Sequence, residues 1–238
     1  MTGDRPAFGV IREIYWALKR RLYMSRAVEQ SVADRFHALS YDAAHFGRGW
    51  ADSHWLGTPL WKLPLDLWIY QEILHETKPD VIIETGTYLS GSALYFASLC
   101  DLLGRGRVVT IDVEERPGRP RHDRITYLRG SSTDSAIVQQ VTRMVGAEDR
   151  TMVVLDSDHA CSHVARELEL YSKLVGVGCY LIVEDTNVNG HPVWPDFGPG
   201  PYEAVDQFLA STRSFARDRQ RERFLVTFNP GGYLRRIA

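Results

Sequence analysis

DVIIETGTYLSGSALYFASLCDLLGRGRVVTID, residues 80–112, holds two short β-branched runs on either side of a helical pattern. The runs are residues 80–85 and 107–112, and the helical pattern covers residues 91–103. Two strands joined through a helix are typical of neighbouring parallel strands, because a parallel pair needs a long crossover connection. The stretch therefore predicts a parallel sheet with helices packed on its faces.

The same alternation continues to the C-terminus. Five further β-branched runs follow, at residues 125–130, 151–158, 178–185, 223–228 and 232–237, and helical patterns lie at residues 134–146, 160–175 and 201–215. The turn signal Asn229-Pro230-Gly231-Gly232 separates the last two runs and predicts an antiparallel pair at one edge. We predict an α/β fold in residues 79–238, with a seven-stranded, mostly parallel sheet and helices on both faces.

Residues 1–78 are predicted to form an N-terminal helical and aromatic extension. Apolar residues recur at helical spacing between residues 8 and 30, with Arg and Lys among them: Ile11, Ile14, Tyr15, Leu18 and Leu22. This helix is interpreted as packed on its own domain or on a partner subunit, and alternatively as lying on a membrane surface. We expect this extension to provide the contacts of a homo-oligomer.

An aromatic-rich stretch, residues 41–68, follows and is interrupted by glycines and prolines, which predicts an ordered loop region. Its aromatic side chains are Tyr41, Phe46, Trp50, Trp55, Trp61 and Trp68. Two interpretations stay open: these rings belong to the core, or they form the wall of a small-molecule pocket. A helical pattern resumes at residues 65–76.

The composition excludes several classes of protein. The 238 residues include 28 Lys and Arg against 30 Asp and Glu, so the net charge of −2 gives no general attraction to nucleic acid. Three cysteines without CxxC spacing favour a reducing compartment. No signal peptide or membrane-spanning segment is recognised, so we expect a cytoplasmic protein. Arginine far outnumbers lysine, which indicates either a GC-rich coding sequence or anion recognition.

The turn after the first predicted strand has the composition of a nucleotide-binding turn. Gly86 and Gly91 allow close backbone approach before a helix, although the turn lacks the G-x-G-x-x-G pattern and the P-loop lysine. Asp112, at the end of the second strand, suits the hydroxyls of a ribose. Together they indicate adenosine binding without a pyrophosphate, as in S-adenosylmethionine. Ser132 follows the third strand, either as part of a helix cap or facing an adenine.

Acidic residues end the next two predicted strands. Asp156-Ser157-Asp158-His159 follows one strand, and Glu184-Asp185 follows the other. Neighbouring parallel strands would bring these carboxylates together, and clustered carboxylates repel one another unless a cation lies among them. Oxygen ligands of this kind suit Mg²⁺, whereas a set that includes histidine also suits Mn²⁺ or Fe²⁺. The alternative is that these acids are solvated helix caps.

The whole pattern over residues 79–237 resembles class I S-adenosylmethionine-dependent methyltransferases, which have a Rossmann-like fold. Within that class it is most similar to the metal-dependent O-methyltransferases. That group includes the catechol, caffeoyl-CoA and macrolide-sugar O-methyltransferases and the cephalosporin-hydroxylase-like (CmcI-like) and rhamnosyl O-methyltransferases. The resemblance implies two cofactors, S-adenosyl-L-methionine and Mg²⁺ or another divalent cation.

The resemblance also implies roles for individual residues. The implied cofactor-binding residues are Glu84, Gly86, Tyr88, Ser92, Asp112, Ser132 and Asp156. The implied metal ligands are Asp156, Glu184 and Asp185, with the choice between Asp156 and Asp158 left open. His159 occupies the position of the general base, and an imidazole suits that role near neutral pH. His163 is a weaker candidate for the same role.

The implied reaction is methyl transfer to a hydroxyl of a sugar, rhamnose-like, or of a polyketide or glycoside natural product. A histidine in place of the lysine of catechol-type members favours a sugar hydroxyl. The long loop 186–204 is expected either to line the acceptor pocket, through Asn187, His191, Trp194 and Phe197, or to be purely structural. A hydroxylase or oxygenase component and a non-catalytic subunit on the same fold stay as alternatives.

Overall fold

The computed structural model describes residues 7–23 and 25–238. Its seven-stranded sheet has the strand order β5–β4–β3–β6–β7–β9–β8. The strands are β3 (Val81–Thr85), β4 (Arg107–Asp112), β5 (Ile125–Arg129), β6 (Thr151–Leu155), β7 (Tyr180–Val183), β8 (Phe215–Arg217) and β9 (Tyr233–Arg236). Strands β5, β4, β3, β6 and β7 pair in parallel, and β9 pairs antiparallel with both β7 and β8. The predicted seven-stranded, mostly parallel sheet is confirmed.

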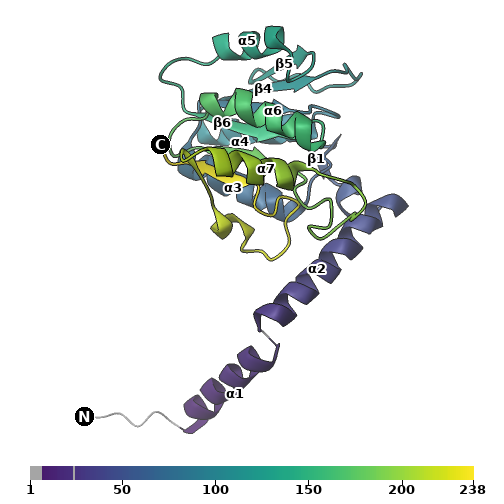
Figure 1. Cartoon of the computed structure of the whole chain (residues 1–238), viewed down its shortest axis with the longest axis vertical. Coiled ribbons are helices and arrows are strands. Elements are labelled where there is room, and N and C mark those ends of the chain that lie inside the picture. The colour runs from purple at the N-terminus through teal and green to yellow at the C-terminus, as the bar shows by residue number, and fades with distance from the viewer. Residues whose placement is uncertain (1–6, 24) are drawn as a thin grey trace, which may run out of the picture.

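Helices cover both faces of this sheet, as predicted (Figure 1). One face carries α5 (Ser135–Arg143), α6 (Cys161–Tyr171) and α7 (Pro201–Ser211), and the other carries α3 (Pro64–Thr77) and α4 (Gly91–Leu103). In β3 the neighbours Ile82 and Ile83 belong to the two different cores, because successive strand residues point to opposite faces. All five residues of β3 are buried, so this central strand is fixed from both sides.

One predicted strand is wrong. Residues 223–228 form no strand; the edge strand is β8, which precedes them, and the helix expected to reach residue 215 ends at Ser211. The reason is Asp66 on α3, which accepts a hydrogen bond of 2.5 Å from the Thr227 hydroxyl and one of 2.9 Å from the Phe228 N–H. These polar groups are therefore satisfied by α3 instead of by a neighbouring strand.

The N-terminal residues form two successive helices, α1 (Ala7–Tyr23) and α2 (Arg26–Asp42). The helical pattern predicted over residues 8–30 is therefore helical but divided between two helices, the second of which continues to Asp42. Figure 1 shows this arm projecting away from the sheet, with α1 at its far end. Two residues of α2, Ala33 and His37, are buried against the chain, with Ala33 in a small core with Val226 and Phe228. No helix within the described residues is long and apolar enough to cross a membrane.

A short hairpin and two 3-10 turns connect α2 to α3. The turns are η1 (Ala43–Phe46) and η2 (Gly49–Asp52), and the hairpin pairs β1 (His54–Trp55) with β2 (Thr58–Pro59). Two further 3-10 turns, η3 (Ser172–Leu174) and η4 (Arg219–Glu222), follow α6 and β8. The loop region expected over residues 41–68 is irregular only between residues 43 and 63, because α2 continues to Asp42 and α3 begins at Pro64. This segment lies beside the carboxyl ends of the central strands.

Candidate active site

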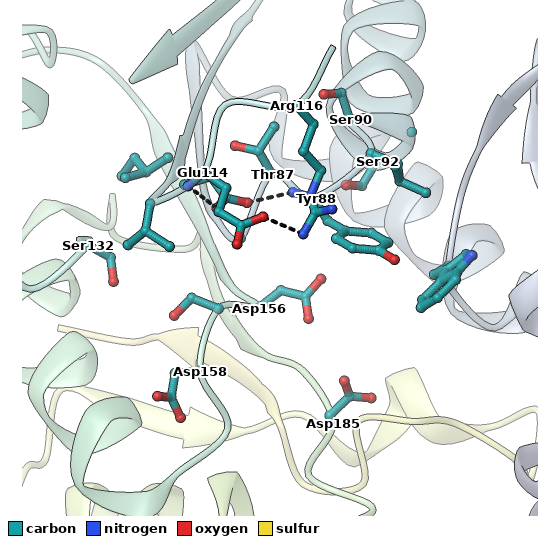
Figure 2. A pocket seen from close by; sticks show the side chains of 18 of the residues that line it. Thr87, Tyr88, Ser90, Ser92, Glu114, Arg116, Ser132, Asp156, Asp158 and Asp185 are labelled. Carbon is teal, nitrogen blue, oxygen red and sulfur yellow. Dashed lines mark hydrogen bonds and ion pairs between the residues drawn. The ribbon is translucent and has the colours of Figure 1, made fainter. Parts of the chain in front are cut away.

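A cavity of about 770 Å³ lies at the carboxyl ends of the central strands. The turn after β3, the end of β4, and the segments that follow β5, β6 and β7 line it on one side. Tyr41, Trp50 and Trp61 line it from the N-terminal segment. Figure 2 shows the carboxylates of Asp156 and Asp185 directed toward the same space, opposite Tyr88. The cavity is large enough for a nucleoside cofactor and part of a second ligand.

The turn between β3 and α4 depends on Gly86. Its φ is +85°, and a Cβ added to it would lie 1.8 Å from the carbonyl oxygen of Asp156. Only glycine allows this approach. Tyr88 and Ser90 in the same turn also have positive φ, +43° and +66°. Backbone in this unfavourable region is typical of functional turns.

Asp112 and Ser132, the predicted ribose and adenine residues, both line the cavity with Tyr88 and Ser92. The Asp112 carboxylate accepts hydrogen bonds from the Tyr88 N–H at 2.7 Å and the Glu114 N–H at 2.9 Å, which fixes its orientation. Each carboxylate oxygen retains a further lone pair for a ligand hydroxyl. Arg116 stacks over the Tyr88 ring at 4.7 Å and was not foreseen from the sequence.

Glu84 is placed differently from the other predicted cofactor residues. It is completely buried within β3 and does not line the cavity. Its Oε2 accepts a hydrogen bond of 2.6 Å from the Thr110 hydroxyl, while its Oε1 is buried without a hydrogen-bond partner among the described residues. Burial raises the pKa of Glu84 to about 7, although the charge of Lys62 opposes this shift.

Asp156, His159 and Asp185 form a cluster of metal-ligating side chains. One ligand atom from each lies within 4.8 Å of the others, and His159 Nε2 is 3.2 Å from Asp185 Oδ2. Burial raises the pKa of both carboxyls, while Lys62 opposes this at Asp156 and His159 opposes it at Asp185. Asp158 is exposed and accepts a hydrogen bond from the Ala160 N–H, so geometry favours Asp156 as the clustered residue of the two.

Lys62 is the residue that sequence reasoning missed. Its side chain is only 3% exposed, and Nζ lies 2.7 Å from both Asp156 Oδ2 and Glu184 Oε1. Burial alone would lower the pKa of Lys62, but the neighbouring carboxylates raise it well above its usual value, so this lysine stays charged. Glu184, predicted as a metal ligand, is therefore paired with an ammonium group in this structure.

The charge balance of the site fits a divalent cation. Four buried or half-buried carboxylates meet at the strand ends: Glu84, Asp156, Glu184 and Asp185. Lys62 supplies one full positive charge among them. Buried like charges are stable only when paired or bound to a metal. The carboxylate oxygens suit Mg²⁺ or Mn²⁺, and a donor set that also includes the His159 imidazole suits Mn²⁺ or Fe²⁺.

His163, the second candidate base, lies deeper in the cavity. Its Nε2 is 3.2 Å from the hydroxyls of both Ser132 and Ser157. Glu167, 3.6 Å away, raises the pKa of His163 by hydrogen bonding, against the opposing effect of burial. These contacts occupy Nε2 of His163 with Ser132 and Ser157, whereas His159 belongs to the cluster with Asp156 and Asp185.

Part of the aromatic stretch lines the cavity, whereas the predicted pocket residues of the long loop 186–204 do not. Trp50 and Trp61 line the cavity, whereas Trp55 packs edge-on against Tyr95. Both interpretations of the aromatic stretch therefore hold, each for different rings. The four loop residues expected at an acceptor pocket do not line the cavity: Asn187, His191, Trp194 and Phe197. The loop is instead held to α2 by a hydrogen bond between Asn187 and His37, and to α7 by hydrogen bonds from Asn189 and His191 to Glu203.

Comparison with known proteins identifies the family. The family model Rhamnosyl O-methyltransferase/CmcI matches residues 48–237. Curated rhamnosyl O-methyltransferases of Mycobacterium tuberculosis (strain H37Rv) and Mycobacterium leprae are 38% and 34% identical to the chain. The matches cover 86% and 94% of this chain and 84% and 97% of the relatives.

A solved structure of CmcI with Mg and SAM has the same fold. It superposes with a TM-score of 0.61 at 23% identity, over 79% of this chain and 78% of that one. The fold and the extensive match to the family model agree with the resemblance found in the sequence. The chain therefore belongs to the rhamnosyl O-methyltransferase/CmcI family, which confirms the predicted family and the prediction of an O-methyltransferase.

Proposed function

We propose that the protein transfers a methyl group from S-adenosyl-L-methionine to a hydroxyl of a rhamnose-like sugar on a glycosylated natural product, with Mg²⁺ as second cofactor. One observation carries this proposal: a single cavity joins the Gly86–Ser92 turn and Asp112 to the cluster of Asp156, His159 and Asp185. The names of the curated relatives support rhamnose as the sugar.

In this proposal the cofactor lies across the carboxyl ends of β3, β4 and β5. The oriented carboxylate of Asp112 accepts the ribose hydroxyls, and Ser132 faces the adenine side. Gly86, Tyr88 and Ser92 form the wall at the methionine end. Glu84 is buried and does not line the cavity, and its Oε1 has no hydrogen-bond partner among the described residues; in its ionised form this carboxylate would provide negative charge for the methionine ammonium.

Asp156 and Asp185 are the metal ligands on which sequence and geometry agree. The third is Glu184 by family resemblance and His159 by proximity. When bound, the ion supplies Lewis acidity that lowers the pKa of the acceptor hydroxyl and orients it. Lys62 meanwhile holds Asp156 and Glu184 by ion pairs.

His159 is the proposed general base. Its ring lines the cavity, and its Nε2 faces Asp185, so an imidazolium formed by taking the hydroxyl proton would be stabilised by that carboxylate. The aromatic rings of Tyr41, Trp50 and Trp61 form the wall available to a sugar ring. Most of the rate acceleration would come from alignment of hydroxyl and methyl group, which contributes roughly 7–11 kcal/mol in well-oriented reactions.

We propose a cytoplasmic enzyme that forms a homo-oligomer. The exposed apolar stripe on α2, formed by Val28, Val32, Phe36 and Leu39, supports such a contact. Sedimentation of the purified chain would test it.

The oxygenase alternative is not favoured by the site. Iron-dependent oxygenases of the facial-triad type use two histidines and one carboxylate, whereas this cluster has one histidine and two carboxylates. A non-catalytic subunit would need neither a clustered donor set nor a base beside it.

The test is methyl transfer with labelled cofactor to rhamnosylated acceptors, with and without EDTA, together with calorimetric cofactor and Mn²⁺ binding. We expect His159→Ala to bind the cofactor normally but lose most turnover, while His163→Ala retains turnover. Glu184→Gln and His159→Ala then compare the two candidates for the third ligand. The variant that lacks the ligand should show the larger loss of Mn²⁺ affinity, since residues that only orient the ligands already contribute about 10–100-fold. Full turnover in EDTA would refute the metal, and full turnover of His159→Ala would refute the base.

A further inference from the structure

Helix α1 has no covering surface within the described residues. Every residue from Val10 to Arg21 is exposed, including apolar side chains that elsewhere would form a core. Its large exposed hydrophobic residues are Val10, Ile11, Ile14, Tyr15, Trp16 and Leu18. A helix of this length is marginally stable in water on its own and normally depends on packing of one face. The structure therefore leaves α1 in need of an external partner.

The apolar residues of α1 form one face. Ile11, Ile14, Tyr15 and Leu18 follow one another at spacings i, i+3, i+4 and i+7. Trp16 lies toward the polar side, and Lys19 stands over both the Trp16 and Tyr15 rings, 5.2 and 5.6 Å from their centroids. An apolar face bordered by aromatic rings and long basic side chains suits a boundary between water and hydrocarbon.

The charge of α1 is opposite to that of the chain as a whole. The helix contains four basic residues, Arg12, Lys19, Arg20 and Arg21, and one acidic residue, Glu13, while the full chain has a net charge of −2. The next helix has two basic and three acidic residues. The positive charge is thus confined to the exposed end of the arm, where it would attract an anionic surface.

A second copy of the same helix is a poorer partner. A symmetric pair of α1 helices would bring together two helices that each carry four basic residues and one acidic residue, with no surface of opposite charge between them. The nearly neutral stripe on α2 is free of this repulsion and is a separate surface.

We infer that α1 is a peripheral membrane-docking helix that binds anionic lipid surfaces. Its apolar face enters the boundary between headgroups and acyl chains, and Lys19, Arg20 and Arg21 reach the anionic headgroups. The arm joins it to the domain through α2, so the catalytic domain is held beside the membrane surface (Figure 1). This inference does not depend on the proposed methyl transfer.

The experiment is co-sedimentation of the full chain with vesicles of equal parts phosphatidylcholine and phosphatidylglycerol, compared with phosphatidylcholine alone. We expect binding to the anionic vesicles only, weakened by high salt. Arg20→Gln with Arg21→Gln should weaken binding about 25-fold, since each cation contributes about fivefold. Ile11→Ser with Leu18→Ser should weaken it roughly tenfold or more.

The matched control is Leu102→Ser with Val177→Ser on the surface of the domain, where Val177 is 63% exposed against 64% for Ile11. This control should bind vesicles like the wild type, and all variants should bind S-adenosylmethionine equally. Equal binding of both vesicle types, or equal loss in the control on the domain surface, would overturn the inference. So would a fall in the lipid-free sedimentation mass caused by Ile11→Ser with Leu18→Ser, because α1 would then be a protein–protein contact.

Discussion

Replacing Lys62 by methionine tests whether this lysine is the counter-ion of the buried carboxylates. Methionine has a similar length and fills the same space, so the change removes charge with little loss of packing. Asp156 and Glu184, each 2.7 Å from the ammonium, would then be left without it. Both carboxyls lie in a site where burial opposes ionisation, so neither can turn to bulk water instead.

The expected effect is large. Removing one partner of a buried ion pair typically costs about 3–5 kcal/mol, and here one lysine serves two carboxylates. We therefore expect Lys62→Met to lower the free energy of unfolding by about 3–5 kcal/mol near pH 8. Because burial raises the pKa of Glu184 to about 7, that carboxyl becomes protonated below neutral pH, and the loss should be smaller near about pH 6.

The assay is urea unfolding followed by tryptophan fluorescence and circular dichroism, with Mg²⁺ absent and at a saturating concentration. Lys173→Met, at an exposed lysine, is the matched control and should change stability by less than about 0.5 kcal/mol. Saturating Mg²⁺ should recover part of the loss in Lys62→Met, because a divalent ion restores positive charge beside the same carboxylates. A Lys62→Met variant within about 1 kcal/mol of wild type near pH 8 without metal would refute the counter-ion role.

Three other outcomes follow from the structure. Gly86→Ala should abolish cofactor binding measured by calorimetry, because its Cβ would lie 1.8 Å from a backbone oxygen. The control Gly104→Ala, also at a positive φ but with no atom within 4 Å of the added Cβ, should bind the cofactor normally. Normal binding by both variants would contradict the close approach. Asp66→Ala should lower the free energy of unfolding by about 3 kcal/mol or more, since three buried donors lose their acceptor, and a loss below about 1 kcal/mol in urea titrations would be inconsistent with that role. In metal-free protein the free energy of unfolding should fall as pH rises from about 5 to about 8. The reason is that the folded state raises the pKa of Glu84 and Glu184 to about 7 and so holds their protons more tightly than the unfolded chain does. A free energy of unfolding that stays constant across urea titrations at these pH values would argue against this.

The fold could be predicted over most of the chain because its strands are buried runs with clear helices between them. The helix expected at residues 91–103 has these same bounds in the structure. The failure at residues 223–228 has a physical cause that local pattern does not contain. That stretch is apolar like a strand, but Asp66, about 160 positions earlier, binds its backbone and fixes it as an irregular segment.

The candidate site was predictable for a geometrical reason. Parallel strands end on the same edge of a sheet, so Asp112, Asp156 and Asp185 could be brought together from strand order alone. Lys62 could not be found this way, because it belongs to an irregular segment outside the sheet. One signal was present: it is one of four lysines in the chain and stands in the apolar run Leu60–Pro64, where a charged residue needs a buried partner.

The close approach of Gly86 to the Asp156 carbonyl makes the proposed cofactor site and the proposed metal site share one piece of backbone. The turn at the methionine end cannot shift without displacing the residue that begins the metal cluster, and the reverse holds equally. Occupancy of one site should therefore alter affinity at the other by the same factor in both directions, as linkage requires. An inhibitor built for the cofactor site would then bind with a strength set in part by the divalent ion concentration around it.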